Sequence, residues 1–187
     1  MDAIDLLLHR RSAKTLAEPG PDEGALTLLL ESAARAPDHG RLRPWRFIVI
    51  RGPGRERLGR LMAEQLKRTR PTATLEAIER ERQKAFRSPL VIAVAAVGDP
   101  TAKVPVIEQV LCAGAAAQNI LLAARALGFG AVWKTGAAAY DETVKAALGL
   151  DGKDAIVGFV YIGTETPVDA APPAGGAWRD RMSFWDD

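Results

Sequence analysis

The segment that most restricts the fold runs from Val104 to Leu127, where the pattern predicts one long helix that is apolar on nearly every side. Such a helix is buried either at the centre of a domain or at a subunit interface. Five polar or charged side chains within it disfavour a membrane span: Glu108, Gln109, Gln118, Asn119 and Arg125. Small residues from Ala113 to Ala117 would let another backbone approach closely. The sequence pattern leaves both of these placements open.

Four short apolar runs predict strands at 47–50, 90–97, 129–133 and 155–162. Helices are predicted at 3–9 and 141–148, and an apolar stripe predicts another between Asp22, a candidate N-cap, and Pro37. Residues 54–87 are rich in arginine, glutamate and lysine, and we expect two exposed helices there. Continuous apolar strands separated by helices indicate a sheet covered on both faces, in an α/β or α+β fold.

Composition excludes several classes of function. The formal net charge of +2, without a long Lys/Arg block interleaved with aromatics, gives no support for nucleic-acid binding. The single cysteine, Cys112, cannot form an internal disulfide and is expected to be buried and inert. With only His9 and His39, a multi-histidine metal site is excluded. Asp2 and Asp5 interrupt the N-terminal apolar run, so we expect no signal peptide and a cytoplasmic location.

The first candidate site is the cluster Arg10, Arg11, Ser12 and Lys14, which lies just past a predicted helix end. Guanidinium groups pair with phosphate oxygens, and a hydroxyl donates a further hydrogen bond, so the cluster can hold a phosphate. The alternative is that these cations only complement the dipole of the helix. Lys14 fits this alternative less well, because it lies beyond the last helical turn.

Two further segments have the composition of ligand sites. The loop from Arg35 to Trp45 contains His39, and loops with such side chains are common binding sites; the alternative is a solvated surface loop with Trp45 packed beneath it. The segment from Gly128 to Gly136 has glycines at both ends, which permit a ligand to approach the backbone closely. Its end, Trp133, Lys134 and Thr135, offers a cation and a hydroxyl; the alternative is a core strand with Trp133 buried.

Three sequence elements resemble, in their order and spacing, those of the nitroreductase family, in its compact bacterial subfamily. They are R-R-S-x-K at 10–14, A-P…P-W-R-F at 36–47 and G-F-G-x-x-W-[KR]-[ST]-G at 128–136. The resemblance covers the chain from Met1 to about Gly163. It implies an α+β fold with a central, mostly antiparallel sheet flanked by helices. It also implies an intertwined homodimer with two FMN sites at the subunit interface.

Matched residue by residue, the resemblance implies the following cofactor contacts. Arg10 and Ser12 fall where the family holds the FMN phosphate and ribityl chain, with Arg11 between them, and Lys14 falls near the pyrimidine end of the flavin. Arg35 and His39 match positions that the partner subunit presents. The strand end that lines the flavin corresponds to Trp133, Lys134 and Thr135. No catalytic side chain and no metal is expected, because the flavin carries the chemistry and Lys14 tunes it.

The activity implied is that of an FMN-dependent oxidoreductase that uses NAD(P)H to reduce nitroaromatic or quinone-like acceptors, by ping-pong hydride transfer through the flavin. Two alternatives stay open: the same fold with other flavin chemistry (a dehydrogenase, a dehalogenase or a flavin-consuming enzyme), and a non-catalytic flavin-binding protein. The residues do not choose between NADH and NADPH. We expect the segment 54–87 to form a mobile cover of the acceptor pocket.

The chain departs from the family pattern in two places. Asp38 and Arg41 stand where many relatives carry serine and asparagine, which leaves the role of both residues open. The basic phosphate contact near the C-terminus of larger relatives has no clear match, although Arg179 or Arg181 are candidates. We expect a single domain over 1–187, in which the residues from about 164 form an extended arm. The tryptophans of this segment favour an arm that docks on a partner over a disordered tail.

Overall fold

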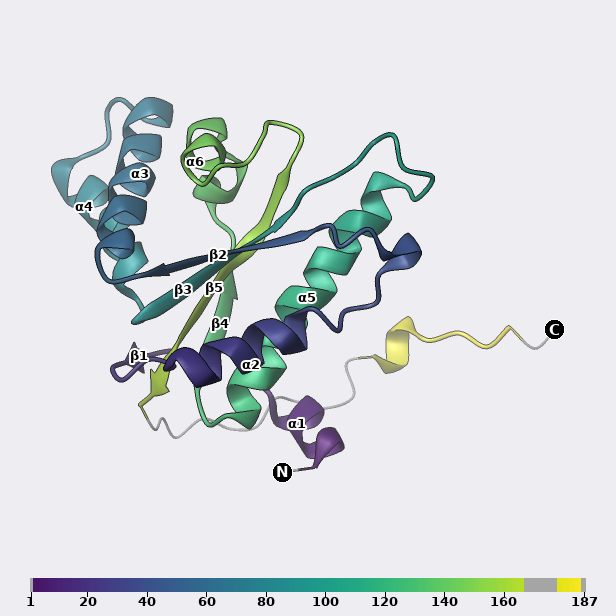
Figure 1. Cartoon of the computed structure of the whole chain (residues 1–187). Helices are drawn as coiled ribbons and strands as arrows, with labels where there is room; N and C mark the ends of the chain where they lie inside the picture. Colours follow the sequence, from purple (N-terminus) through teal and green to yellow (C-terminus); the bar gives the residue numbers. More distant parts are fainter. Residues whose placement is uncertain (1, 167–177, 186–187) are drawn as a thin grey trace.

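A computed structural model describes residues 2–166 and 178–185 of the chain (Figure 1). The helices are α1 (Ala3–His9), α2 (Glu23–Ala33), α3 (Pro53–Thr69), α4 (Leu75–Gln83), α5 (Val106–Ala126) and α6 (Glu142–Ala147). The strands are β1 (Leu16–Ala17), β2 (Trp45–Arg51), β3 (Leu90–Ala96), β4 (Gly130–Lys134) and β5 (Ala155–Glu165). Short 3-10 helices occupy His39–Arg41, Lys84–Phe86, Ala137–Tyr140 and Arg179–Arg181.

All pairs of neighbouring strands in the sheet are antiparallel. Strands β3 and β5 lie at its centre, β2 pairs with the outer edge of β3, and both β1 and β4 pair with β5. The predicted α+β fold with a mostly antiparallel sheet flanked by helices is therefore confirmed.

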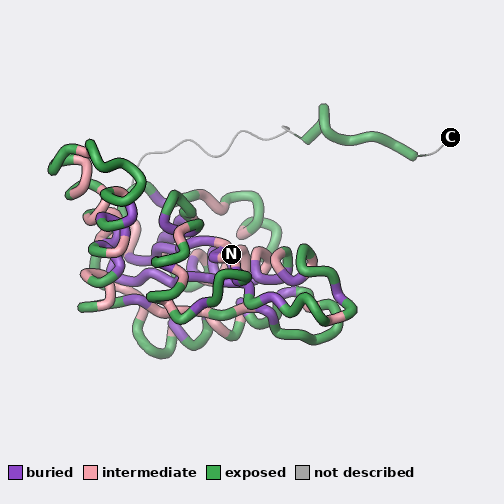
Figure 2. The backbone as a smooth tube through the Cα atoms, turned by 90° about the horizontal axis from the view of Figure 1, so that it is seen from above, coloured by how far each residue is buried: buried purple, intermediate pink, exposed green. Residues whose placement is uncertain are grey.

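The sheet separates two apolar cores, because consecutive side chains of a strand point to opposite faces. In β3, Ile92 and Val94 face the core formed with α2 and α5, whereas Val91 and Ala93 face the core formed with α3 and α6. Every residue of β3 is buried, as expected for a strand covered on both faces. Figure 2 shows this arrangement as a buried interior between exposed outer segments.

Helix α5 packs one side on the sheet and leaves the other side exposed. Ala113, Ala116 and Ile120 are fully buried in the core, whereas Leu111 is 64% exposed. By length and composition alone α5 could cross a membrane, but the core helices of soluble proteins meet the same weak criterion. Its apolar character on nearly every side is thus explained only in part by the fold of one chain.

Most predicted elements are confirmed within two or three residues. Asp22 caps α2, since its Oδ1 accepts a hydrogen bond of 2.8 Å from the N–H of Ala25, and Cys112 is buried. The expectation that both helices of 54–87 are exposed is wrong for α3. Leu58 and Met62 lie on one face of α3, four residues apart, and join the core beneath it. Helix α4 has no buried residue.

Candidate functional site

The cluster at 10–14 is held in place by the elements on either side of it. Asp2 caps α1 by accepting hydrogen bonds from the N–H groups of Ile4 and Asp5, at 2.8 and 2.9 Å. The helix ends at Arg10, where the backbone becomes extended. The N–H of Ala13 then donates to the carbonyl of Ala131 at 3.0 Å, which fastens the segment beside the start of β4.

The side chains of this cluster differ in how free they are to bind a ligand. The Arg11 guanidinium lies 3.4 Å from a carboxylate oxygen of Glu165, whose side chain is only 11% exposed. Arg10, Ser12 and Lys14 make no side-chain hydrogen bond or ion pair with any of the residues that the structure describes. A guanidinium, a hydroxyl and an ammonium without partners form a donor set that suits a phosphate joined to a larger polar ligand.

The second segment is a tightly turned loop that Asp38 holds together. Gly40, Arg41 and Arg43 adopt φ angles of 74°, 54° and 50°, in the left-handed region that side chains rarely occupy. The Asp38 carboxylate accepts hydrogen bonds from the backbone N–H groups of Leu42 and Arg43, at 3.1 and 2.8 Å. The departure at Asp38 therefore has a structural role, because this carboxylate stabilises the unusual backbone of the loop.

His39 is fastened to the first turn of α5. Its Nδ1 lies 2.6 Å from a carboxylate oxygen of Glu108, and 69% of the His39 side chain is exposed. Arg35, in the same loop, is exposed and has no ion pair within the described part of the chain. Both residues therefore point away from the core of their own chain.

The third segment ends β4 at the edge of the sheet. The Trp133 indole packs across β5, where its Nε1 donates to the carbonyl of Val157 at 3.2 Å and its ring covers the backbone of Gly158. Lys134 and Thr135 are exposed, and Gly136, at a φ of 70°, turns the chain out of the strand. The alternatives for this segment are both realised, since Trp133 packs inward while Lys134 and Thr135 face outward.

Within one chain the three segments do not all come together. The 10–14 cluster and the 133–135 strand end both border β4. His39 instead lies at the N-terminal end of α5, while Ala124, near the C-terminal end of α5, hydrogen-bonds to the residue that precedes β4. At 1.5 Å per residue these two ends of the helix are about 24 Å apart.

A cavity of about 310 Å³ borders the end of β4 and contains residues that sequence reasoning missed. Besides Trp133, Lys134 and Thr135 it is lined by Lys84 and Arg87, from the end of the helical segment, and by Met62 and Tyr161. Tyr161 is 2% exposed and has no hydrogen-bond partner for its hydroxyl among the described residues. Burial raises the pKa of Tyr161 to about 12. Because Tyr161 lies within an apolar strand, the sequence gives no indication that it lines a cavity.

Comparisons with known proteins agree with this geometry. A family model described as the nitroreductase family matches residues 7–164. The chain is 42% identical over 164 residues to YdjA of Escherichia coli K12, a candidate NAD(P)H nitroreductase, and the match covers 88% of each protein. Its fold is similar to that of a nitroreductase-like family protein from Bacillus cereus, with a TM-score of 0.83, 25% identity and coverage of 100% of this chain and 97% of that one. It also resembles a nitroreductase with bound FMN from Bacteroides fragilis, with a TM-score of 0.71, 17% identity and coverage of 95% and 97%.

Proposed function

The chain belongs to the nitroreductase family, and from this premise we propose that it is an FMN-dependent oxidoreductase that uses NAD(P)H to reduce nitroaromatic or quinone-like acceptors in the cytoplasm. The observation that carries the proposal is the set of donors at Arg10, Ser12 and Lys14 beside β4, which have no side-chain partner among the described residues. Bound FMN supplies the hydride and electron transfer, so the protein itself has to bind, orient and tune the cofactor.

The donor set fits FMN in charge and in order along the chain. Arg10 and Ser12 would hold the phosphate and the ribityl chain, with Arg11 beside them. Lys14 would place its ammonium at the pyrimidine end of the ring. Lys134 and Thr135, exposed at the end of β4, would line the ring, and the packed Trp133 would keep that strand end in position.

Arg35 and His39 are proposed to complete the site of the partner subunit in a homodimer. An exposed apolar stripe on α5 that includes Ile107 and Leu111, together with the exposed leucines of α1, offers the surface for such a dimer. A two-fold axis perpendicular to α5 would set the two copies of the helix antiparallel. The His39 end of one chain would then lie near the 10–14 cluster of the other.

The C-terminal segment adds to the apolar surface that a dimer would cover. Trp178, Phe184 and Trp185 are all exposed, and large aromatic side chains are costly to leave in water. We propose that this segment is an arm that docks on the partner subunit. Arg179 stacks on Trp178 and Arg181 lies beside Asp180. We therefore assign neither arginine a contact with the FMN phosphate. Residues 167–177 of the predicted arm lie outside the described residues.

The absorbance spectrum of the purified protein tests the proposal most directly. We expect a yellow protein that releases FMN, and not FAD, on denaturation. The reason is that the sequence has a candidate phosphate-binding cluster but not the G-x-G-x-x-G pattern that binds dinucleotides. Anaerobic NADH or NADPH should then bleach the flavin absorbance. A colourless protein that also takes up no added FMN would contradict the proposal, and a bound FMN that neither nucleotide bleaches would favour a non-catalytic flavoprotein.

Replacing Lys14 by methionine should leave FMN bound but make it harder to reduce. In the proposed site, the ammonium of Lys14 would stabilise negative charge at the pyrimidine end of the reduced cofactor. Loss of one charge-assisted interaction should shift the two-electron midpoint potential by about 30–60 mV to more negative values. Spectroelectrochemistry measures this shift, and Lys67→Met, at an exposed position on α3, is the matched control. Equal potentials in both variants would remove Lys14 from the site.

A further inference from the structure

The cavity at the end of β4 holds more unpaired positive charge than the flavin contacts explain. Arg87 and Lys134 line it without any ion pair within the described residues. Lys84 also lines it and pairs with Glu81 at 2.5 Å, the one carboxylate on its wall. The wall therefore has a net charge of about two positive units.

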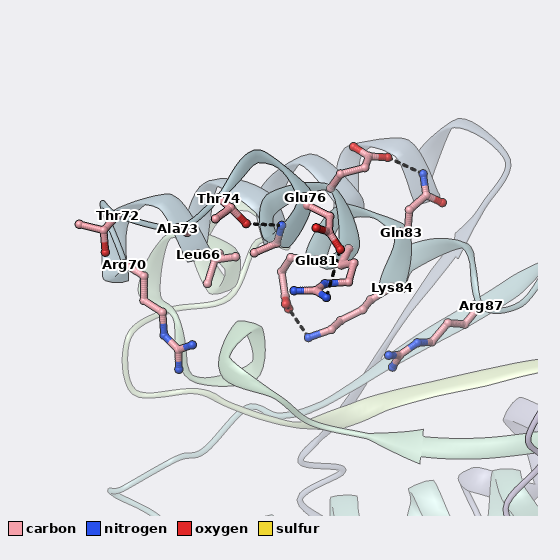
Figure 3. A pocket seen from close by; sticks show the side chains of 13 residues that line it. Leu66, Arg70, Thr72, Ala73, Thr74, Glu76, Glu81, Gln83, Lys84 and Arg87 are labelled. Carbon is pink, nitrogen blue, oxygen red and sulfur yellow. Dashed lines mark hydrogen bonds and ion pairs between the residues drawn. The ribbon is translucent and has the colours of Figure 1, made fainter.

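Most other arginines near this cavity are paired with carboxylates. Carboxylates neutralise three of them: Arg68 pairs with Asp141, Arg80 with Glu76, and Arg82 with Glu56 and Glu79. Arg70, like Arg87, has no such partner within the described residues, and both line a larger adjoining cavity of about 920 Å³. Figure 3 shows Glu81 reaching Lys84, and in this view the side chains of Arg70, Lys84 and Arg87 all lie below the helices.

The Tyr161 hydroxyl provides an independent second observation. Tyr161 lines this cavity, and its hydroxyl is not among the fully buried polar atoms of the described residues that lack a partner, so the hydroxyl is accessible from the cavity. Tyr161 is almost fully buried beneath the cavity and its hydroxyl has no partner among the described residues. Because burial disfavours the charged form of the phenol, the hydroxyl keeps its proton and can donate it to an acceptor in the cavity.

We propose that Arg87, Lys84, Lys134 and the Tyr161 hydroxyl form an oxyanion site for a cosubstrate that approaches the end of β4. The ligand is a phosphate or carboxylate group on a small molecule, since such oxyanions accept both charge-assisted and hydroxyl hydrogen bonds. Two cosubstrates could carry it: the 2′-phosphate of NADPH or the carboxylate of an aromatic acceptor. The inference rests on the proposed function, because it assigns specificity to the same site.

The test uses two pairs of compounds that differ only in the oxyanion. Calorimetry compares the binding of adenosine 2′,5′-bisphosphate with that of 5′-AMP, and steady-state kinetics compares 4-nitrobenzoate with 4-nitrobenzamide. The variants are Arg87→Ala and Tyr161→Phe, which keeps the aromatic ring and so the packing. Arg60→Ala is the control, because Arg60 is an exposed cation of α3 that lines neither cavity.

The wild-type protein should prefer the oxyanion-bearing member of at least one pair, and the pair affected identifies the source of the oxyanion. Arg87→Ala should reduce that preference about 10-fold and Tyr161→Phe about threefold, whereas Arg60→Ala should leave it unchanged. Preferences in Arg87→Ala within about twofold of the wild type for both pairs would overturn the proposal. Loss of FMN from Arg87→Ala but not from Arg60→Ala would also overturn it, since the cation would then serve the cofactor.

Failure of the proposed function would look different. A wild-type protein that binds no FMN, or whose FMN neither NADH nor NADPH reduces, would refute that function. In that case calorimetry, which needs no turnover, would compare the binding of both pairs of compounds and would still decide whether the oxyanion site exists.

Discussion

Gly158→Ala will destabilise the protein by about 3 kcal/mol, enough to lower its melting temperature by about 6–12 °C. A methyl group at this position would overlap the Trp133 indole, which packs directly on the Gly158 backbone. The indole would have to move, and its hydrogen bond to the Val157 carbonyl would be lost. Thermal unfolding at fixed protein and FMN concentrations measures the change, because bound ligand also shifts the melting temperature.

A double-mutant cycle assigns this effect to the contact itself. Combined with Trp133→Ala, Gly158→Ala should cost much less than it does alone, since the group it collides with has gone. Gly54→Ala is the matched control. A methyl group there would meet Ile50 at an ordinary 3.4 Å, in the first turn of a helix, so its effect should be small. Additive costs of Gly158→Ala and Trp133→Ala would refute the packing explanation.

Two inactive variants should restore activity when they are combined in one dimer. In the proposed homodimer, Arg10→Glu and Arg35→Glu would each place a reversed charge in both flavin sites, so each substitution should weaken FMN binding about 10- to 150-fold or more. If each flavin site contains Arg10 of one subunit and Arg35 of the other, a mixed dimer has both substitutions in one site and none in the second site. Flavin content and activity should then return to one site per mixed dimer.

Co-expression with two different affinity tags, followed by purification over both, isolates the mixed dimers for this measurement. Arg10→Glu mixed with wild-type chains provides the reference, because it should also keep one intact site. Tagged mixed dimers that form but stay without flavin would show that Arg10 and Arg35 serve the site of a single chain. The proposed crossing of the two chains would then be wrong.

Periodicity predicted most of the fold because each large element has an apolar pattern of its own. Strand β1 escaped prediction, since Leu16 and Ala17 are strand residues only through their pairing with Glu165 and Thr164. The exposure of α3 was mispredicted because the many charges around Leu58 and Met62 masked a narrow apolar stripe. Both errors concern contacts between segments that are distant in the sequence.

The candidate site was predictable where the family motifs lie and not elsewhere. The motifs at 10–14 and 133–135 contain side chains whose chemistry suits a phosphate or a flavin, and the structure places both segments along β4. The role of Asp38 became clear only from its hydrogen bonds to the loop backbone. Arg87 and Tyr161 become neighbours in one cavity through the pairing of β3, β5 and β4, which no local pattern encodes.

The order of the strands also has a consequence for synthesis on the ribosome. Strand β3 can pair with β2 early, but its other edge pairs with β5, which includes Val160 and Ile162 and is translated much later. Until β5 emerges, a fully apolar strand has one unpaired edge, the kind of edge on which nascent chains associate. Such non-local pairing also slows folding. We therefore expect heterologous yield to depend on growth temperature and on chaperone supply more than on the stability of the finished protein.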